Sequence, residues 1–269
     1  MLTLKNICFG YESSTPLLDN ISTTIHPGQI TAIAGRNGSG KSTFTRLLMG
    51  LLQLTSGSIH LKDLDITTKK PQEISQYISY VFQNAEQQLF CSTVFDEVAY
   101  ALQQRKINTT AIKEQVNSIL TQLDLNDYAL ELPQMLSIDQ KQRLTIACAL
   151  VTNPQFLILD EPTSGQDCRQ RTRLLRLIQK LKARGLGIIL VTHDMDIIAE
   201  HADKILVLHQ GKLAFDGTCT NLFSNADLTA SLGLDLPESV RISQELGLKL
   251  SLTPQELYAQ LSTNNQHFI

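Results

Sequence analysis

The segment GRNGSGKST, residues 35–43, constrains the fold of this chain more than any other stretch of its sequence. It follows an apolar, strand-like run, ITAIA, and precedes FTRLLMGLL, whose larger apolar residues share one helical face. A glycine-rich loop between a strand and a helix is the context of a phosphate-binding loop. Its backbone N–H groups turn inward around phosphates, and the helix N-terminus adds a favourable dipole. The sequence therefore predicts a nucleotide site at this turn.

Individual residues of this loop have separate expected roles. We expect Lys41 to reach the β- and γ-phosphates of ATP, and Ser42 to bind Mg²⁺. The remaining loop residues expected to surround the nucleotide are Gly35, Asn37, Gly38, Ser39, Gly40 and Thr43.

A second segment, FLILDE at residues 156–161, delivers two acidic side chains at the end of an apolar strand. We expect Asp160 to hold Mg²⁺ through water and Glu161 to polarise the attacking water. Taken alone, an Asp-Glu pair after a strand is more often a helix N-cap or a solvated turn. Because this pair follows a phosphate loop and leads into PTSGQD, the sequence favours the catalytic interpretation.

Three further residues become candidates for the site once these two segments are recognised. Gln83 ends an apolar run and would contact Mg²⁺ and the attacking water, and His193 ends GIILVTHD and would bond the γ-phosphate. Tyr11 would stack on adenine, since a ring with one polar atom suits a nucleobase. Considered singly, each has an ordinary structural explanation, as a loop amide, a strand-end histidine and a half-buried tyrosine.

The order of the predicted elements indicates an α/β fold. Four apolar runs, ITAIAG, FLILD, GIILVTH and KILVLHQGKLAF, are separated by helical patterns, as in a parallel sheet that is buried on both faces. Shorter extended runs fill the first third of the chain. The pattern turns helical between Gln83 and Leu150, where Ile112, Val116, Ile119, Leu120 and Leu123 recur at helical spacing.

The last 53 residues, 217–269, form a tail that the core does not obviously need. Leu236-Pro237-Glu238 would open one helix that ends at Gly247. Thr253-Pro254-Gln255-Glu256 is a capping box with proline at the first helical position, after which Leu257 and Leu261 share a face. Amphipathicity alone leaves open whether this tail is a packed cap or a surface that binds a partner.

Composition excludes several classes of partner. The 269 residues carry 23 basic and 26 acidic side chains, and no basic block is expected, so we predict no binding to nucleic acid. Five scattered cysteines without a C-x-x-C pair suggest reduced thiols in the cytosol. Without a signal-peptide pattern or a run of eighteen apolar residues, we expect a cytoplasmic protein that does not insert into the membrane by itself.

The chain resembles the ATP-binding cassette ATPases. Tyr11, GRNGSGKST, Gln83, the LSIDQ segment at 136–140, FLILDE, PTSGQD and THD occur in that family's order and approximate spacing, over residues 1 to about 217. The chain is most similar to the ATPase subunits of energy-coupling factor transporters and of cobalt and nickel uptake systems. This narrower resemblance is carried by VFQNAEQQLFCSTVFDEVAYAL, VTHDMDIIAEHADKILVLHQGKL and SLGLDLPESVRISQEL.

The resemblance implies a fold and an assembly. It implies a P-loop NTPase core at 1–216, with an N-terminal antiparallel β subdomain and an inserted helical subdomain at about 84–150, and a helical extension at 217–269 that helps ATPases to pair. It implies an ATPase at the cytoplasmic side of the membrane that forms a dimer with a second ATPase, a heterodimer being favoured. A membrane coupling subunit would dock beside Gln83 and act on a substrate-binding membrane subunit for vitamins or metal ions.

The signature segment departs from the family pattern. The family usually has Leu-Ser-Gly-Gly-Gln, whereas Ile138 and Asp139 replace the two glycines here, and only Ser137 and Gln140 remain to contact the partner's nucleotide. At ~5 Å from a phosphate charge and an effective dielectric constant of ~20, the aspartate repels it by about 3 kcal/mol. Without nucleotide, we expect Asp139 to cap its helix. The segment would thus slow the partner's site, unless the family tolerates such changes without consequence.

Two other functions are compatible with these motifs. One is a soluble cassette ATPase of DNA repair or translation, which the single cassette and the 119-residue separation of Lys41 and Asp160 disfavour, since no long coiled coil fits. The other is a regulatory subunit that holds nucleotide without turnover, which Asp139 favours and Glu161 with His193 oppose.

Overall fold

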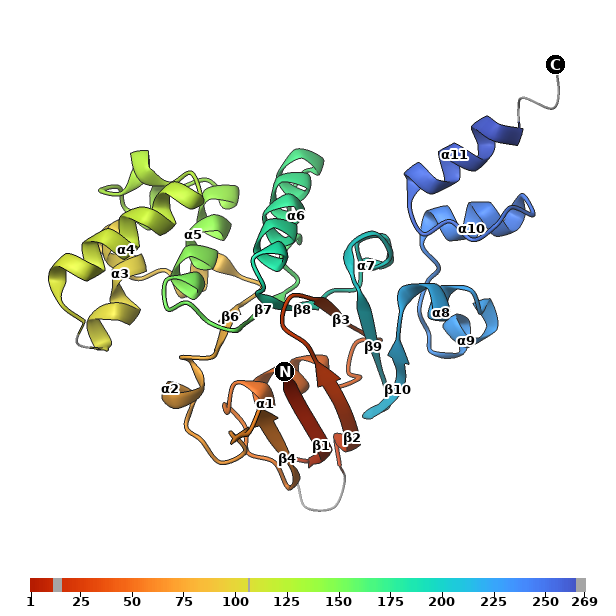
Figure 1. Cartoon of the computed structure of the whole chain (residues 1–269), viewed down its shortest axis with the longest axis horizontal. Helices are drawn as coiled ribbons and strands as arrows, with labels where there is room; N and C mark the ends of the chain where they lie inside the picture. Colours follow the sequence, from red (N-terminus) through yellow and green to blue (C-terminus); the bar gives the residue numbers. More distant parts are fainter. Residues whose placement is uncertain (12–15, 106, 265–269) are drawn as a thin grey trace.

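The computed structural model describes residues 1–11, 16–105 and 107–264 (Figure 1). The strands within these residues form two sheets, and most helices lie on either side of the larger one. The expected α/β class is therefore confirmed. In the described part of the chain, no helix is both long enough and apolar enough to span a bilayer.

The N-terminal part forms an antiparallel sheet. Its strands, in the order β2-β1-β4-β5, are β1 (Leu2–Phe9), β2 (Leu18–Ile25), β4 (Ser56–Leu61) and β5 (Leu64–Asp65). Residues Leu2, Leu4 and Ile7 of β1 are fully or nearly fully buried, while Lys5 and Asn6 are exposed. One face of this sheet thus packs on the core and the other meets solvent.

The larger sheet has the strand order β10-β9-β3-β8-β7-β6. Its strands are β3 (Ile30–Ala34), β6 (Ile78–Val81), β7 (Phe156–Asp160), β8 (Gly187–Val191), β9 (Lys204–His209) and β10 (Lys212–Gly217). All neighbours are parallel except the β9–β10 hairpin. Every residue of β3 and β8 is buried, as expected for strands covered on both faces. The carboxyl ends of four strands consequently meet at one edge.

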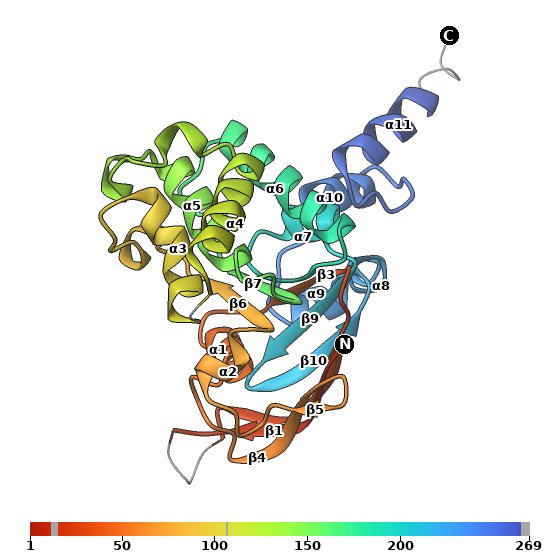
Figure 2. The same cartoon turned by 60° about the vertical axis from the view of Figure 1, so that its left-hand side comes forward.

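Helices cover this sheet and connect its strands. The core helices are α1 (Lys41–Leu48), α2 (Pro71–Ile74), α6 (Cys168–Ala183) and α7 (Met195–His201). A helical region follows β6 and precedes β7, and Figures 1 and 2 show it to one side of the sheet. It contains η1 (Ala85–Gln88), α3 (Val94–Gln104), α4 (Thr109–Gln122), η2 (Asn126–Tyr128), η3 (Pro133–Met135) and α5 (Ile138–Leu150).

The helical pattern predicted for 112–123 is confirmed by the buried face of α4. Ile112, Val116 and Leu120 are buried and belong to the same apolar cluster as Val98 of α3 and Leu144 of α5. This small core holds the three helices together.

The described part of the C-terminal tail, up to residue 264, forms four helices rather than the two that the sequence predicts. They are α8 (Cys219–Phe223), α9 (Ala226–Ser231), α10 (Glu238–Glu245) and α11 (Pro254–Asn264). Leu222 and Phe223 are fully buried in one cluster with Ala32 and Ala34 of β3. The first half of the tail therefore packs on the core, which is one of the two alternatives that the sequence left open.

The last helix begins at Pro254 as predicted, with a modified cap. The Thr253 hydroxyl accepts the backbone N–H of Glu256 at 3.2 Å, but the Glu256 carboxylate accepts from Leu252 rather than from Thr253. Leu257 is buried, whereas Leu261 is 37% exposed. The expected apolar face thus exists, and its outer end meets solvent.

Candidate functional site

A cavity of about 820 Å³ lies at the carboxyl edge of the large sheet. It brings together segments that are far apart in the sequence, namely the glycine loop after β3, Gln83 after β6, Asp160 and Glu161 at β7 and His193 after β8. Ligands of open α/β sheets bind at such an edge. The predicted site residues that line the cavity are Gly35, Asn37, Gly38, Gly40, Lys41, Ser42, Thr43, Gln83, Asp160, Glu161 and His193.

The loop before α1 adopts a conformation that requires glycine. Gly35, Gly38 and Gly40 have φ angles of 142°, 80° and 104°. A Cβ added at Gly35 would collide with the carbonyl oxygen of Leu208, and one at Gly40 would lie 2.5 Å from Leu18 Cδ2. The backbone of this loop is therefore folded against the core and exposes its other side to the cavity.

The ammonium group of Lys41 lies inside this loop. Its Nζ donates hydrogen bonds to the carbonyl oxygens of Gly35 at 2.6 Å and Arg36 at 3.2 Å. Burial lowers the pKa of Lys41, while the nearby carboxylates of Glu161 and Asp160 act in the opposite direction. The cation is thus preorganised beside the two acidic residues of β7.

Asp160 is held by a tyrosine that the sequence analysis did not single out. The Tyr80 hydroxyl donates to Asp160 Oδ2 at 2.7 Å and lies 3.2 Å from the Thr45 hydroxyl. Burial raises the pKa of Tyr80 well above its usual value, so this hydroxyl stays a donor at neutral pH. A tyrosine within the apolar strand β6 was the available signal, since a buried hydroxyl requires a partner.

Glu161 and His193 contact each other directly. His193 Nδ1 lies 2.8 Å from Glu161 Oε1, and the Thr192 hydroxyl donates to Glu161 Oε2 at 3.2 Å. Glu161 has a φ of 46°, which is costly for a residue with a side chain. Its backbone N–H bonds to the carbonyl of Val191 at 2.8 Å, which holds the residue in this conformation. The carboxylate is positioned by β8 rather than by its own strand alone.

The residues present fit ATP and Mg²⁺. The glycine loop and Lys41 line the cavity and bring backbone N–H groups and a cation, which suit phosphate oxygens. Ser42, Gln83 and Asp160 offer oxygen ligands, which Mg²⁺ prefers. Within the described ranges, no cluster of three His, Cys, Asp or Glu residues could hold a metal alone. Magnesium would therefore depend on these few protein oxygens together with phosphate and water.

Four predicted nucleotide contacts do not line this cavity. The first is Ser39, whose hydroxyl is buried and has no hydrogen-bond partner among the described residues. Tyr11 is 64% exposed and packs edge-on against Phe9, with ring centroids 4.9 Å apart. Ser137 and Gln140 lie at the start of α5, where each bonds the other's backbone N–H, at 3.3 and 2.8 Å. Conversely, Leu234 and Asp235 of the tail line the cavity, and no sequence signal indicated this.

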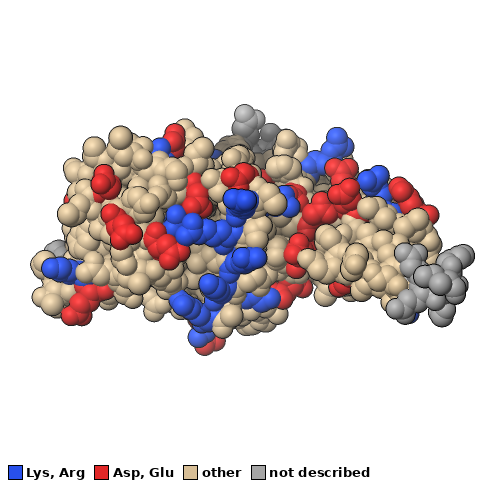
Figure 3. All heavy atoms as spheres, turned by 90° about the horizontal axis from the view of Figure 1, so that it is seen from above, with Lys and Arg blue, Asp and Glu red and all other residues tan. Residues whose placement is uncertain are grey.

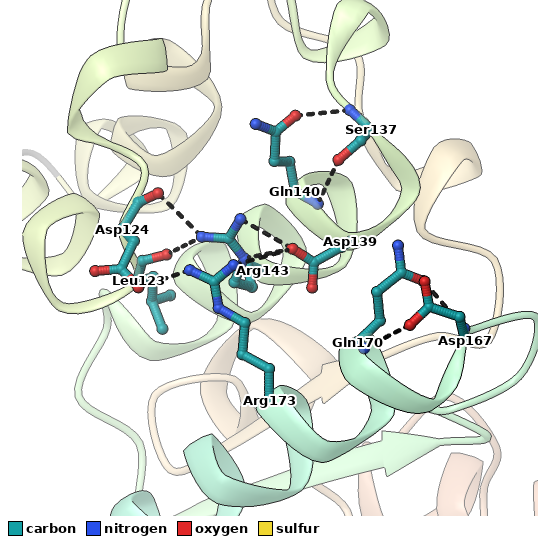
Figure 4. A network of polar contacts seen from close by, with 9 residues as sticks. All are labelled: Leu123, Asp124, Ser137, Asp139, Gln140, Arg143, Asp167, Gln170 and Arg173. Carbon is teal, nitrogen blue, oxygen red and sulfur yellow. Dashed lines mark hydrogen bonds and ion pairs between the residues drawn. The ribbon is translucent and has the colours of Figure 1, made fainter.

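The expectation that Asp139 caps its helix is wrong, because Ser137 is the N-cap of α5. Asp139 Oδ2 instead accepts from Arg143 Nε and Nη2, at 3.1 and 3.0 Å, and lies 3.6 Å from Arg173 Nη1 of α6 (Figure 4). Its carboxylate is thus charge-paired toward the interior. Ile138, in contrast, is 62% exposed.

Comparisons with known proteins agree with this geometry. Residues 18–164 match the family model described as ABC transporter. The chain is 38% identical over 264 residues to the energy-coupling factor transporter ATP-binding protein EcfA1 of Staphylococcus aureus (strain USA300), covering 97% of this chain and 98% of that protein. It is 39% identical to an ABC transporter ATP-binding protein of Onion yellows phytoplasma (strain OY-M), over 87% of this chain but only 40% of the longer relative.

Among solved structures, cbiO1 from Clostridium perfringens superposes with a TM-score of 0.79 at 30% identity. The match covers 92% of this chain and 98% of that one, and its title describes it as part of the ABC transporter complex cbiONQ.

Proposed function

Since this chain belongs to the ATP-binding cassette transporter ATPases of the energy-coupling factor and cobalt type, we propose that it powers the uptake of a vitamin or a metal ion. The observation that best supports ATP hydrolysis is that the Glu161–His193 pair and Lys41 line one cavity. Glu161 acts as the group that polarises the attacking water, and His193 orients Glu161 and contacts the γ-phosphate. Lys41 stabilises phosphate charge. Mg²⁺, held through Ser42, Gln83 and Asp160, would neutralise charge on the phosphates when bound.

The second part of the proposal is an assembly in which each nucleotide lies between two ATPase subunits. Ser137 and Gln140 lie outside this chain's own cavity, which supports a role toward the nucleotide of a partner. Adenine contact by Tyr11 belongs to the same proposal. The exposed Tyr258 and Leu261 of α11 support a pairing role for the end of the 217–269 extension.

A heterodimer would make the two sites unequal. Ile138 and Asp139 would then affect only the site built on the partner's phosphate loop. Changing Lys41 to Ala in the assembled pair should abolish most turnover, while the same change in the partner's loop should lower it less, allowing for coupling through dimer closure. Equal losses from the two changes would contradict the asymmetry.

The third part is attachment to the membrane through a protein subunit. An apolar hollow of about 800 Å³ lies beside β6 and α3, where Phe82, Phe90 and Tyr100 are 42%, 64% and 43% exposed. Phe90 and Tyr100 pack edge-on at 5.0 Å, so the surface is ordered although exposed. Exposed apolar patches of this kind mark interaction sites, and Phe90 and Tyr100 belong to the segment after Gln83 that we propose to dock.

The docking proposal is tested by changing Phe90 to Ser and measuring copurification with membrane subunits from native membranes. The matched control is Leu130→Ser, because Leu130 is 86% exposed and lies outside the hollow. The Phe90 change should release the ATPase from the membrane and the Leu130 change should not. Binding of the purified chain to protein-free liposomes at physiological salt would contradict attachment through protein. Identification of the copurifying subunits would also test the uptake of a vitamin or metal ion.

The same copurification experiment, together with turnover measurements, distinguishes this proposal from the two alternative functions. A soluble ATPase of repair or translation would bring no membrane subunit with it. A regulatory subunit would bring one and hold nucleotide, but the complex would not lose turnover when Glu161 is changed.

A further inference from the structure

A second large cavity, of about 1090 Å³, lies between the helical region and α6, away from the nucleotide cavity. The end of α4, the start of α5 and one face of α6 form its walls, and none of the phosphate-loop residues line it. We propose that this cavity binds a small organic molecule that carries two or more phosphate groups. Nothing in the proposed transport function requires such a site.

The first argument is the charge of the cavity. Six cations line it, against two carboxylates, Asp124 and Asp139. The cations are Arg143, Arg169, Arg173, Arg176, Lys180 and Arg184. The sequence analysis expected no basic block, and this is wrong for α6. Figure 3, viewed from above, shows Lys and Arg side chains gathered in a band near the middle of the molecule.

The second argument is which of these charges are already paired. Both carboxylates are engaged, since Arg143 and Arg173 contact Asp139, and Arg173 also pairs with Asp124 at 2.8 Å (Figure 4). The other four cations of the cavity have no ion-pair partner within the described residues: Arg169, Arg176, Lys180 and Arg184. Spaced at seven, four and four residues along α6, they repel one another on one helix face. A multiply charged anion would relieve this repulsion.

The third argument is the shape and chemistry of the walls. Arg143 is only 7% exposed and is fixed by the carbonyls of Leu123 and Asp124, so the floor of the cavity is rigid. Guanidinium groups match phosphate oxygens in paired hydrogen bonds. Leu174 and Leu177 add apolar surface beside the cations, which suits the organic part of a ligand. The volume is that of a cavity for a ligand of nucleotide size.

The proposal is tested by calorimetric titration of the full chain with inorganic triphosphate, which carries the proposed phosphate chemistry without a base or sugar. The titration uses a Lys41→Ala background, so that binding at the phosphate loop is weakened and the second site is measured by itself. We expect saturable binding that weakens as salt is added. No saturable binding in this background would overturn the proposal.

Charge removal then locates the binding. Arg176→Gln with Lys180→Gln should weaken triphosphate binding by at least about tenfold, as expected for the loss of charge-assisted hydrogen bonds. Arg169→Gln with Arg184→Gln provides an independent second pair. The matched control is Lys5→Gln with Lys113→Gln, which removes the same charge from exposed positions outside the cavity.

Three outcomes contradict the site. Equal weakening by the control pair would mean general attraction to a basic surface. Unchanged binding in both cavity pairs would place the triphosphate elsewhere. Equal binding of citrate, a multiply charged carboxylate, would contradict the phosphate assignment. Thermal unfolding midpoints equal to the parent's would show that the exposed substitutions leave the fold intact.

Discussion

The nucleotide cavity and the signature segment differ in how their charged side chains are arranged. The cavity takes its polar groups from the ends of four strands, and Lys41 and Glu161 both line it. The signature segment takes its groups from the first turn of α5 and directs Asp139 inward to Arg143 and Arg173. The charges that we propose to act in catalysis therefore line the cavity in the first region, whereas in the second the substituted charge is already paired.

This difference changes which of the two substituted residues, Ile138 or Asp139, should oppose a partner's phosphate more strongly. The estimate of about 3 kcal/mol for repulsion by Asp139 assumes an unpaired carboxylate at an effective dielectric constant of ~20. Two guanidinium groups at 3.0 and 3.6 Å offset that charge. Ile138, exposed at the N-terminus of α5, therefore becomes the larger obstacle to a partner's phosphate.

The largest expected effect follows from changing Glu161 to Gln. Turnover of the assembled ATPase should fall by about 10²–10⁴-fold, because the carboxylate acts on water. ATP binding should remain nearly intact, and the ATP-bound dimer should accumulate. Steady-state hydrolysis and nucleotide binding measure the two effects, with Glu131→Gln as an exposed control. Unchanged turnover in the Glu161 variant would end its assignment as the catalytic residue.

The next effect concerns the fold around the signature segment. Changing Arg143 to Met should lower the free energy of unfolding by roughly 2–4 kcal/mol, because it leaves Asp139 without its buried partner and the carbonyls of Leu123 and Asp124 without a donor. Arg241→Met is the control, since its ion pairs are 3.7 and 3.9 Å long and lie at the surface. Denaturant unfolding measures both. Equal small losses would show that the Asp139 pair adds nothing to stability.

A smaller effect separates the two signature substitutions. Ile138→Gly should raise hydrolysis at the partner's site several-fold, whereas Asp139→Gly should raise it less, because it also releases Arg143. Hydrolysis is measured in the assembled pair with Lys41 changed to Ala, so that only the partner's loop contributes. A larger gain from Asp139→Gly would mean that its charge reaches the partner's phosphate despite the two arginines.

The sequence was most informative where a function requires particular residues at fixed spacing. The glycine loop, Asp160, Glu161, Gln83 and His193 could be predicted to come together, because parallel strands deliver their carboxyl ends to one edge. Tyr80 was missed because its role depends on the pairing of β6 with β7, which local sequence does not specify.

The pairing of Asp139 could not be predicted for the same kind of reason. Arg143 follows on the same helix, but Arg173 reaches Asp139 only because α6 lies beside α5. The helices α8 and α9 could not be predicted because they are short, with five and six residues, too few for a clear helical period. Their burial against β3 is a tertiary contact.

The last expected effect concerns the cation of the nucleotide cavity. Burial lowers the pKa of Lys41 from the usual lysine value. The lysine binds phosphate only when protonated, so nucleotide affinity should fall as the pH rises through the lowered pKa, by up to about tenfold per unit beyond it. Bound phosphates stabilise the protonated lysine, so the pKa of Lys41 in the protein without nucleotide sets the pH at which affinity begins to fall. That pH lies below the usual lysine pKa. ATP affinity titrated from neutral to alkaline pH, in the Glu161→Gln variant to prevent turnover, measures this loss. Constant ATP affinity up to the usual lysine pKa would show that the charge of Lys41 is not what holds the nucleotide, and the contrast between an available charge in the cavity and a paired charge in the signature segment would fail.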